Sequence, residues 1–173
     1  MAQMIYVTGG ARSGKSSYAQ QLAEQHQGDL LYIAPARVED DEMVTRIELH
    51  RQARGERWQL LEEQLWLAER LPDAAAGKGA LLLDCVTLWI TNLFFHFDEQ
   101  QGAVLAEVDR LIELAWQLDE PLYLVSNELG SGIVPENPLA RKFRDLAGIV
   151  NQRLAAAADE AWLVVSGLPV KLK

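Results

Sequence analysis

The sequence predicts an α/β fold: a mostly parallel sheet with helices on both faces and a short antiparallel edge at its C-terminal end. Five short apolar runs have the length and composition of buried strands: residues 4–8, 30–34, 80–84, 122–126 and 161–166. Helical patterns separate these runs, and strands joined through helices form parallel sheets with right-handed crossovers. The length of 173 residues suits one domain over residues 1–173.

The first of these strands runs directly into a glycine-rich turn, and a helix over residues 17–26 follows. The turn matches the phosphate-loop pattern of a glycine, four residues, and then Gly-Lys-Ser. Glycines let successive N–H groups point at a phosphate, and the helix N-terminus adds partial positive charge. We expect Lys15 to reach the outer phosphates and Ser16 to ligate Mg²⁺. The pattern therefore predicts a P-loop NTPase-like fold with these nucleotide-binding residues: Gly9, Gly10, Ala11, Arg12, Ser13, Gly14, Lys15 and Ser16.

Composition argues against several classes of protein. The net charge of -9 argues against a nucleic-acid partner, because proteins that bind the phosphate backbone present a basic face. Cys85 is the only cysteine, so no internal disulfide can form, which is consistent with a cytoplasmic protein. No run is long and apolar enough to span a bilayer, and residues 1–4 are too few for a signal peptide. We therefore expect neither a membrane span nor a leader.

An acidic run follows the second strand, which Pro35 closes. Residues 39–42 are Glu-Asp-Asp-Glu and precede Met43, Ile47 and His50, which are spaced as on one helix face. Acidic residues in a first helical turn complement the helix dipole, so capping is favoured over a metal role for this run.

His50 stands among Arg46, Arg51 and Arg54. Burying so many cations together is costly, so this setting suits a place where an anion binds. On composition alone, a surface histidine is the more ordinary interpretation. His26 near a helix end and His96 in a polar loop are interpreted as structural residues.

The third apolar strand ends in an acid, the usual form of a Walker B strand. A short extended segment over 57–62 and a helix over 64–75 precede this strand. The strand carries Asp84 to the carboxyl edge of the sheet, where its side chain can hold Mg²⁺ through water. The alternative role for Asp84 is N-cap of the helix over 88–95, and the upstream phosphate loop favours the metal role.

The second half of the chain adds a helix over 103–118 and the strand 122–126. Asn127 and Glu128 follow at the carboxyl edge, and the glycine-rich loop 130–136 suggests a lid or a wall of the acceptor site. Asn137-Pro138 predicts a helix start, with Asn as N-cap and Pro at the first helical position. The expected apolar stripe of this helix, which runs to 158, is Leu139, Phe143, Leu146, Val150 and Leu154. Arg141, Arg144 and Arg153 are expected on its solvated flank, and residues 170–172 are expected to form the antiparallel edge.

Taken together, four blocks resemble a known family over essentially the whole chain. They are residues 8–16; Asp41-Glu42-Met43 with Arg46-Ile47 and His50-Arg51; Asp84-Cys85-Val86-Thr87 with Thr91-Asn92-Leu93; and Ser126-Asn127-Glu128 through Gly132-Ile133-Val134-Pro135. The family is the bifunctional adenosylcobinamide kinase and adenosylcobinamide-phosphate guanylyltransferase of cobalamin biosynthesis. Many folds share a phosphate loop, but the sum of these blocks is specific.

The resemblance implies two reactions. ATP or GTP phosphorylates the aminopropanol hydroxyl of adenosylcobinamide, and GMP from GTP then passes to adenosylcobinamide phosphate, giving adenosylcobinamide-GDP. By the same resemblance, His50 attacks the α-phosphate and carries GMP as a phosphoramidate. A neutral imidazole is a competent nucleophile, and nearby arginines can stabilise the phosphoryl group under attack.

The resemblance also implies the remaining site residues. Mg²⁺ would lie between Ser16 and Asp84, and further nucleotide contacts would come from Pro35, Ala36, Arg37, Arg51, Gln52, Ala53, Arg54, Glu62 and Asp84. Some relatives have two adjacent histidines where this chain has Leu49-His50, which leaves one candidate nucleophile. Some carry Glu where Asp84 stands, and the shorter acid would need a bridging water. The resemblance further implies a homotrimer.

Two other functions fit the phosphate loop. One is a small-molecule kinase without guanylyltransferase activity, in which His50 has no covalent role. The other is a nucleotide-dependent switch module, in which hydrolysis gates a partner. In a kinase reaction of either kind, Asp84 and Glu128 are comparable candidates for the base that deprotonates the acceptor hydroxyl.

Overall fold

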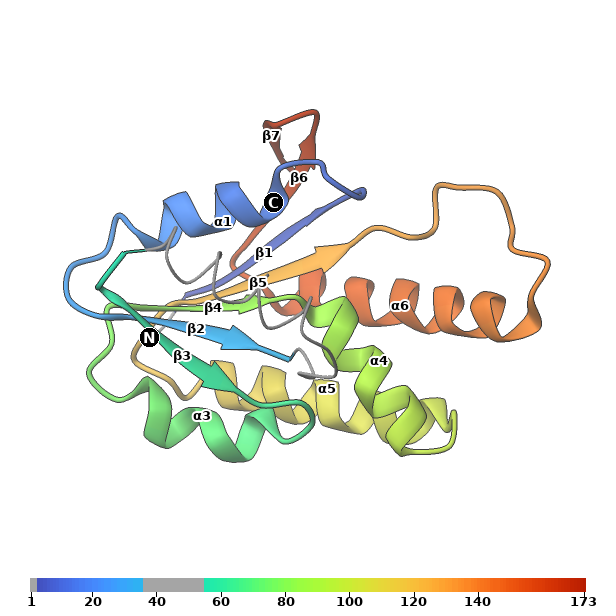
Figure 1. Ribbon diagram of the computed structural model, residues 1–173, viewed down its shortest axis with the longest axis horizontal. Helices are drawn as coiled ribbons and strands as arrows, with labels where there is room; N and C mark the ends of the chain where they lie inside the picture. The colour runs from blue at the N-terminus through green and yellow to red at the C-terminus, as the bar shows by residue number, and fades with distance from the viewer. Residues whose placement is uncertain (1–2, 36–54) are drawn as a thin grey trace.

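The computed structural model describes residues 3–35 and 55–173. They form a seven-stranded sheet with the order β3-β2-β4-β5-β1-β6-β7 (Figure 1). Neighbouring strands run parallel except β6 and β7, which are antiparallel, so the predicted fold class is confirmed. The strands are β1 (Met4–Gly9), β2 (Leu30–Ala34), β3 (Trp58–Glu62), β4 (Ala80–Asp84), β5 (Leu122–Asn127), β6 (Glu160–Val165) and β7 (Leu168–Lys171).

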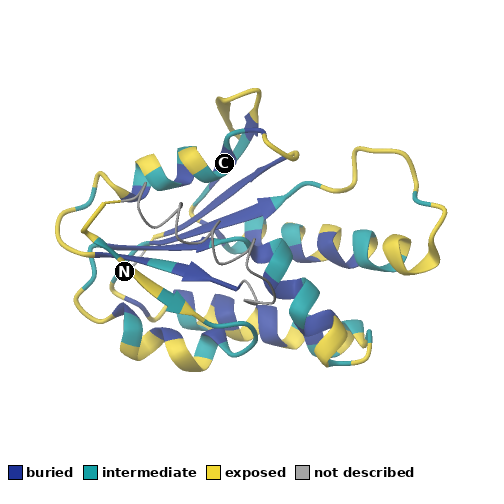
Figure 2. Ribbon diagram, in the orientation of Figure 1, coloured by how far each residue is buried: buried dark blue, intermediate teal, exposed yellow. Residues whose placement is uncertain are grey.

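Helices lie on both faces of the sheet. On one face lies α1 (Lys15–Ala23), and on the other lie α3 (Leu67–Ala75), α4 (Val86–His96), α5 (Gln101–Ala115) and α6 (Pro138–Ala157) (Figure 1). Each face has its own buried cluster, and the cluster under α3 to α6 is the larger. Figure 2 shows that the central strands are buried while the connecting loops are exposed.

Strand alternation assigns each side chain to one of these clusters. In β5, Leu122 and Leu124 belong to the cluster under α4 to α6, whereas Tyr123 and Val125 belong to the cluster under α1. Successive side chains of a strand point to opposite faces, so the same rule extends to the strand ends. Asn127 and Asp84 therefore lie on the face that α1 covers, and Ser126 lies on the other.

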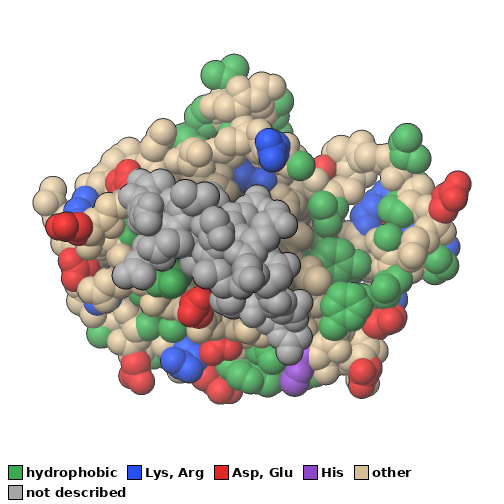
Figure 3. All heavy atoms as spheres, in the orientation of Figure 1, with side chains coloured by type: hydrophobic (Ala, Val, Ile, Leu, Met, Phe, Trp, Pro, Cys, Tyr) green, Lys and Arg blue, Asp and Glu red, His purple; other side chains and the backbone are tan. Residues whose placement is uncertain are grey.

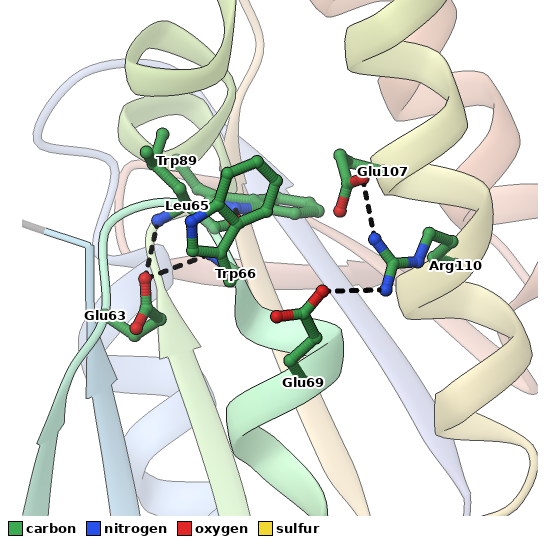
Figure 4. A network of polar contacts seen from close by, with 7 residues as sticks. All are labelled: Glu63, Leu65, Trp66, Glu69, Trp89, Glu107 and Arg110. Carbon is green, nitrogen blue, oxygen red and sulfur yellow. Dashed lines mark hydrogen bonds and ion pairs between the residues drawn. The ribbon is translucent and has the colours of Figure 1, made fainter. Parts of the chain in front are cut away.

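The connections beside the sheet are fixed by partly buried polar contacts. The Glu63 carboxylate accepts hydrogen bonds from the backbone N–H groups of Leu65 and Trp66, at 2.9 and 3.0 Å, just before α3 (Figure 4). The Trp89 indole, on α4, donates to the Leu65 carbonyl at 2.9 Å. These bonds tie the turn after β3 to α4.

An arginine joins α3 to α5 nearby. Arg110 forms ion pairs with Glu69 at 3.1 Å and with Glu107 at 2.9 Å (Figure 4). Arg110 and Glu69 are exposed whereas Glu107 is buried, so we assign the pair between α3 and α5 to orientation of the helices more than to stability.

The short extended segment expected over 57–62 is confirmed as the edge strand β3. Two other expectations from the sequence need correction. His96 is the last residue of α4 and packs against the Trp66 ring, so it does not lie in a polar loop. Leu139 is 36% exposed, because the first turn of α6 extends past the sheet.

Two of the three arginines expected on a solvated flank of α6 have specific partners. Arg141 donates to the carbonyls of Pro135 and Glu136, at 2.9 and 2.6 Å, and so holds the loop before the helix. Arg153 pairs with Asp109 on α5 at 2.6 Å. The predicted N-cap is confirmed, since the Asn137 side chain accepts the N–H of Ala140 at 3.1 Å.

Candidate nucleotide site at the carboxyl edge of the sheet

Three neighbouring strands end at the same edge of the sheet. In the order β4-β5-β1, Gly9 pairs with Asn127 and Asp84 pairs with Val125. The carboxyl ends of parallel strands are where open α/β sheets bind ligands. This edge therefore brings the phosphate-loop glycine, Asn127 and Asp84 together.

The phosphate loop connects β1 to α1, as predicted, and its backbone requires glycine at two positions. A Cβ on Gly9 would lie 2.5 Å from both the Ser13 hydroxyl oxygen and the Val164 carbonyl oxygen. Gly14 is the N-cap of α1 and has a φ of 94°, in the left-handed region that favours glycine. The N–H of Gly167 donates to the Ser13 carbonyl at 2.7 Å, so the turn between β6 and β7 supports the loop from behind.

The loop has the donors that a phosphate needs. Lys15 is buried, and its ammonium donates to the Gly10 carbonyl at 3.1 Å, so it lies across the loop. The Ser13 hydroxyl is buried and has no hydrogen-bond partner among the described residues. An unsatisfied buried hydroxyl costs free energy, and a bound phosphate oxygen would remove this cost. The loop, the ammonium and the N-terminus of α1 together fit a polyphosphate.

Asp84 is not the N-cap of the following helix. The N-cap of α4 is Cys85, whose side chain forms no capping bond, and the helix begins at Val86. The half-buried Asp84 carboxylate is on the α1 face, as is the P-loop Ser16 in the first turn of α1. Burial raises the pKa of the neighbouring Cys85 thiol, which makes it a poor nucleophile here.

The donor set at this edge fits Mg²⁺ only together with a nucleotide. Among the described residues, no three His, Cys, Asp or Glu side chains are grouped to hold a metal ion. Ser16 and Asp84 would supply one hydroxyl and one carboxylate, and Mg²⁺ normally completes such a site with phosphate oxygens and water. The residues present thus fit the arrangement of a nucleotide-bound magnesium.

A polar clamp, formed by Thr87, Ser126 and Asn151, fixes the backbone of Asn127. The Asn127 N–H donates to the Thr87 hydroxyl at 2.8 Å, and the Asn151 amide donates to the Asn127 carbonyl at 3.0 Å. The Ser126 hydroxyl in turn donates to Asn151 Oδ1 at 2.6 Å. β5 extends beyond the end of β4, so side chains of α4 and α6 replace the missing strand partner.

Glu128 links the phosphate loop to the loop after β5. Its N–H donates to the Gly9 carbonyl at 3.0 Å, while its carboxylate accepts the N–H groups of Gly130 and Ser131 at 2.6 and 3.1 Å. Hydrogen bonding by Ser131, with help from these N–H groups and from Arg144, lowers the pKa of Glu128. A carboxylate that is already engaged by these donors is a weak candidate for the base that deprotonates the acceptor hydroxyl.

The remaining sequence-predicted residues are placed as follows. Buried Pro35 ends β2, and its carbonyl accepts the Asn92 amide at 2.7 Å. Glu62 is exposed at the end of β3, two strands from β4. His26 lies after α1, with its Nε2 atom 2.9 Å from the Tyr123 hydroxyl. Seven predicted residues lie outside the described residues: Ala36, Arg37, His50, Arg51, Gln52, Ala53 and Arg54.

Sequence reasoning missed the roles of Thr87 and Asn151. Thr87 is in one of the resemblance blocks and Asn151 is in the predicted helix that runs to 158. Their shared partner, Asn127, is 40 residues from Thr87 and 24 residues from Asn151 along the chain. A hydroxyl and an amide at helical positions carry no signal of such distant bonds.

No helix among the described residues is long and apolar enough to cross a membrane.

Comparison with solved structures finds the same fold elsewhere. A crystal structure of the RadB recombinase has a TM-score of 0.56 and covers 93% of this chain and 73% of its own. The two sequences are 15% identical, so this likeness concerns the fold alone.

Comparison with known sequences identifies much nearer relatives. The profile of the family described as "Cobinamide kinase / cobinamide phosphate guanyltransferase" matches residues 5–172. The bifunctional adenosylcobalamin biosynthesis protein CobU of Escherichia coli is 48% identical, over 98% of this chain and 99% of its own. The protein of the same name from Salmonella typhimurium is 46% identical over 98% and 99%, and CobP of Pseudomonas aeruginosa is 42% identical over 96% and 95%.

Proposed function

Because the chain belongs to the family of cobinamide kinases and cobinamide phosphate guanyltransferases, we propose that its carboxyl-edge site holds the nucleotide for both reactions. The protein is a bifunctional transferase of cobalamin biosynthesis. The observation that carries the assignment of the site is the phosphate loop, with buried Lys15 and the unsatisfied Ser13 hydroxyl, on the same edge as Asp84.

In the kinase reaction, the loop binds the β- and γ-phosphates of ATP or GTP. The aminopropanol hydroxyl of adenosylcobinamide attacks the γ-phosphorus, and the bond to the nucleoside diphosphate breaks. Lys15 neutralises charge that develops on the phosphoryl oxygens. Asp84 accepts the hydroxyl proton, since the Glu128 carboxylate is occupied by Gly130 and Ser131.

In this proposal Ser16 would hold the magnesium ion of the nucleotide directly and Asp84 through a bridging water, which leaves the Asp84 carboxylate able to accept the hydroxyl proton. The ion would supply neutralisation of the phosphate charge. Ser16 lies in the first turn of α1 and Asp84 at the end of β4, so both elements approach the nucleotide from the same face.

In the guanylyltransferase reaction, His50 is the nucleophile. Its imidazole attacks the α-phosphate of GTP, pyrophosphate leaves, and GMP remains on the protein as a phosphoramidate. GMP then passes to adenosylcobinamide phosphate and gives adenosylcobinamide-GDP. Support comes from the sequence, where Arg46, Arg51 and Arg54 accompany His50 and can stabilise the phosphoryl group. Pro35, Ala36, Arg37, Gln52, Ala53 and Glu62 complete the proposed nucleotide contacts.

The proposal includes a homotrimer in the cytoplasm. Apolar side chains on the β6–β7 hairpin support contact between copies: Val165, Leu168, Val170 and Leu172 are 49 to 70% exposed. Figure 3 shows hydrophobic side chains over this hairpin, at the top of the view. An exposed edge strand with apolar side chains is a surface that another protein chain can cover.

The covalent step can be tested directly. We expect wild-type protein incubated with GTP labelled at the α-phosphate to retain label that is stable to alkali and labile to acid, as a phosphoramidate is. His50→Ala should retain none, whereas His26→Ala, a control histidine bonded to Tyr123, should label normally. Absence of label on the wild type, or equal labelling of His50→Ala, would refute the histidine intermediate and favour a kinase without this step.

A further inference from the structure

We infer that the side-chain amide of Asn127 is a further catalytic residue of the kinase reaction, donating a hydrogen bond to the γ-phosphoryl group under transfer. The inference rests on the proposed function of this site. It identifies a residue between the phosphate loop and Asp84 that neither reaction scheme above uses.

The sheet order places Asn127 at the centre of the site. β5 lies between β1, which leads into the phosphate loop, and β4, which ends in Asp84. Asn127 is in register with Gly9, and Asp84 is in register with Val125, two residues earlier in β5. Adjacent strands are about 4.8 Å apart and two residues span about 6.7 Å, so Asn127 is within side-chain reach of both.

The direction of the side chain follows from alternation. Val125 and Tyr123 belong to the cluster under α1, so Asn127 also faces α1. This is the face on which Lys15 begins its helix and on which Asp84 lies. The neighbouring polar residues of the two strands, Ser126 and Thr8, point to the opposite face and are buried there.

The Asn127 side chain is free while its backbone is fixed. Thr87 and Asn151 hold its N–H and its carbonyl. Its own amide is half-buried and forms no hydrogen bond with any residue of the described ranges 3–35 and 55–173. The backbone at this position is thus held in place, and the side-chain amide is left available to bond a ligand.

The chemistry suits an amide. As the acceptor oxygen bonds to the γ-phosphorus and the bond to the bridging oxygen of ADP breaks, negative charge spreads over the γ-phosphoryl oxygens. The hydroxyl proton goes to Asp84, and the amide keeps its own protons throughout. A neutral donor stabilises the oxygens on this side, where a second carboxylate beside Asp84 would repel them.

The test is the rate of γ-phosphoryl transfer from radiolabelled ATP to cobinamide by the full chain. We expect Asn127→Ala to lower kcat about 10²-fold, the usual effect of removing one preorganised donor. Affinity for a fluorescent GTP analogue should change less than about threefold, because the amide acts mainly in the transition state. Asn127→Asp, which keeps the shape of the side chain, should lower kcat at least as much.

Gln59→Ala is the matched control. Gln59 lies on the far edge strand β3, and its side-chain amide donates to Asp29. The Gln59→Ala variant should keep the wild-type kcat. A wild-type kcat in Asn127→Ala or Asn127→Asp overturns the inference, as does a fall in kcat that is matched by an equal loss of nucleotide affinity. If Asn127→Ala does not fold, the isosteric Asn127→Asp decides. Failure of the wild type itself to phosphorylate cobinamide would instead count against the proposed function.

Discussion

The carboxylate of Glu128 makes the loop after β5 sensitive to acid. Hydrogen bonds from Ser131 and Gly130 lower the folded-state pKa of Glu128 below its ordinary value of 4.5. A lowered folded pKa means that the stabilisation is present above the ordinary pKa and is lost as the pH falls through the folded pKa. The carboxylate therefore holds residues 129–131 at neutral pH and releases them in acid.

We predict that Glu128→Gln removes this part of the pH dependence. Thermal unfolding followed from about pH 6 to about pH 3 should fall less steeply in Glu128→Gln than in the wild type. Glu136→Gln, in the same exposed loop, is the control and should follow the wild type. Parallel curves for Glu128→Gln and the wild type would show that the carboxylate does not stabilise the loop.

Single residues could be predicted from the sequence where their signal is local. Residues 9–16 carry their whole pattern within one turn, and Asp84 ends an apolar run, so the sequence placed both after the strands that the fold shows. The clamp of Thr87 and Asn151 on Asn127 was not found, because each bond closes a loop of dozens of residues. The sequence thus shows the local pattern of the phosphate loop, whereas only the fold shows that Thr87 and Asn151 hold the backbone of Asn127.

Among the elements, α6 begins at a local cap, and its first turn extends past the sheet (Figure 1). Asn137 accepts the N–H of Ala140, Pro138 occupies the first turn, and Arg141 binds the carbonyls just before the helix. The first fully buried residue of α6 is Leu146, and before it Phe143 packs on Phe94 and Lys142 pairs with Glu99 at 3.0 Å. The cap and Arg141 hold the first turn, where these contacts have not yet begun.

We predict that Asn137→Ala lowers the free energy of unfolding by about 1 kcal/mol, the usual effect of losing an N-cap oxygen. Asn137→Ser keeps an oxygen acceptor and should restore most of the loss. The measurement is chemical denaturation monitored by circular dichroism. Equal stability of Asn137→Ala and the wild type would contradict this role of the cap.

Sequence patterns predicted elements well where apolar periodicity was strong. The buried strands β1, β2, β4, β5 and β6 were all expected, within about two residues of their ends. The edge strand β3 was expected only as a short extended segment, because none of its five residues is buried and they show no clear alternation of apolar and polar side chains. The stripe of α6 was right from Phe143 onward and wrong at Leu139, which is 36% exposed.

At the scale of the whole molecule, the order of the strands decides which residues meet at the carboxyl edge of the sheet. Chain order runs β1, β2, β4, β5, yet β5 lies between β4 and β1 in space. This arrangement brings Gly9, Asp84 and Asn127 to neighbouring strands although they span more than half of the chain. Parallel topology was predictable from strands that alternate with helices, but the order of the strands depends on packing that no local pattern reports.

The same arrangement implies that Lys15 is the residue on which phosphoryl transfer most depends. Its buried ammonium is the one cation that the described loop fixes over the expected phosphates, through the Gly10 carbonyl. The other cation of this loop, Arg12, is exposed. Loss of the ammonium removes charge stabilisation that water cannot replace in a buried site.

The decisive measurement is transfer of the γ-phosphate of radiolabelled ATP to cobinamide by the wild type, Lys15→Ala and the control Lys78→Ala, which lies in the loop before β4. We predict labelled cobinamide phosphate from the wild type and from Lys78→Ala, and a rate lowered at least about 10²-fold in Lys15→Ala. Transfer by Lys15→Ala at the wild-type rate would contradict the assignment of this edge as the nucleotide site.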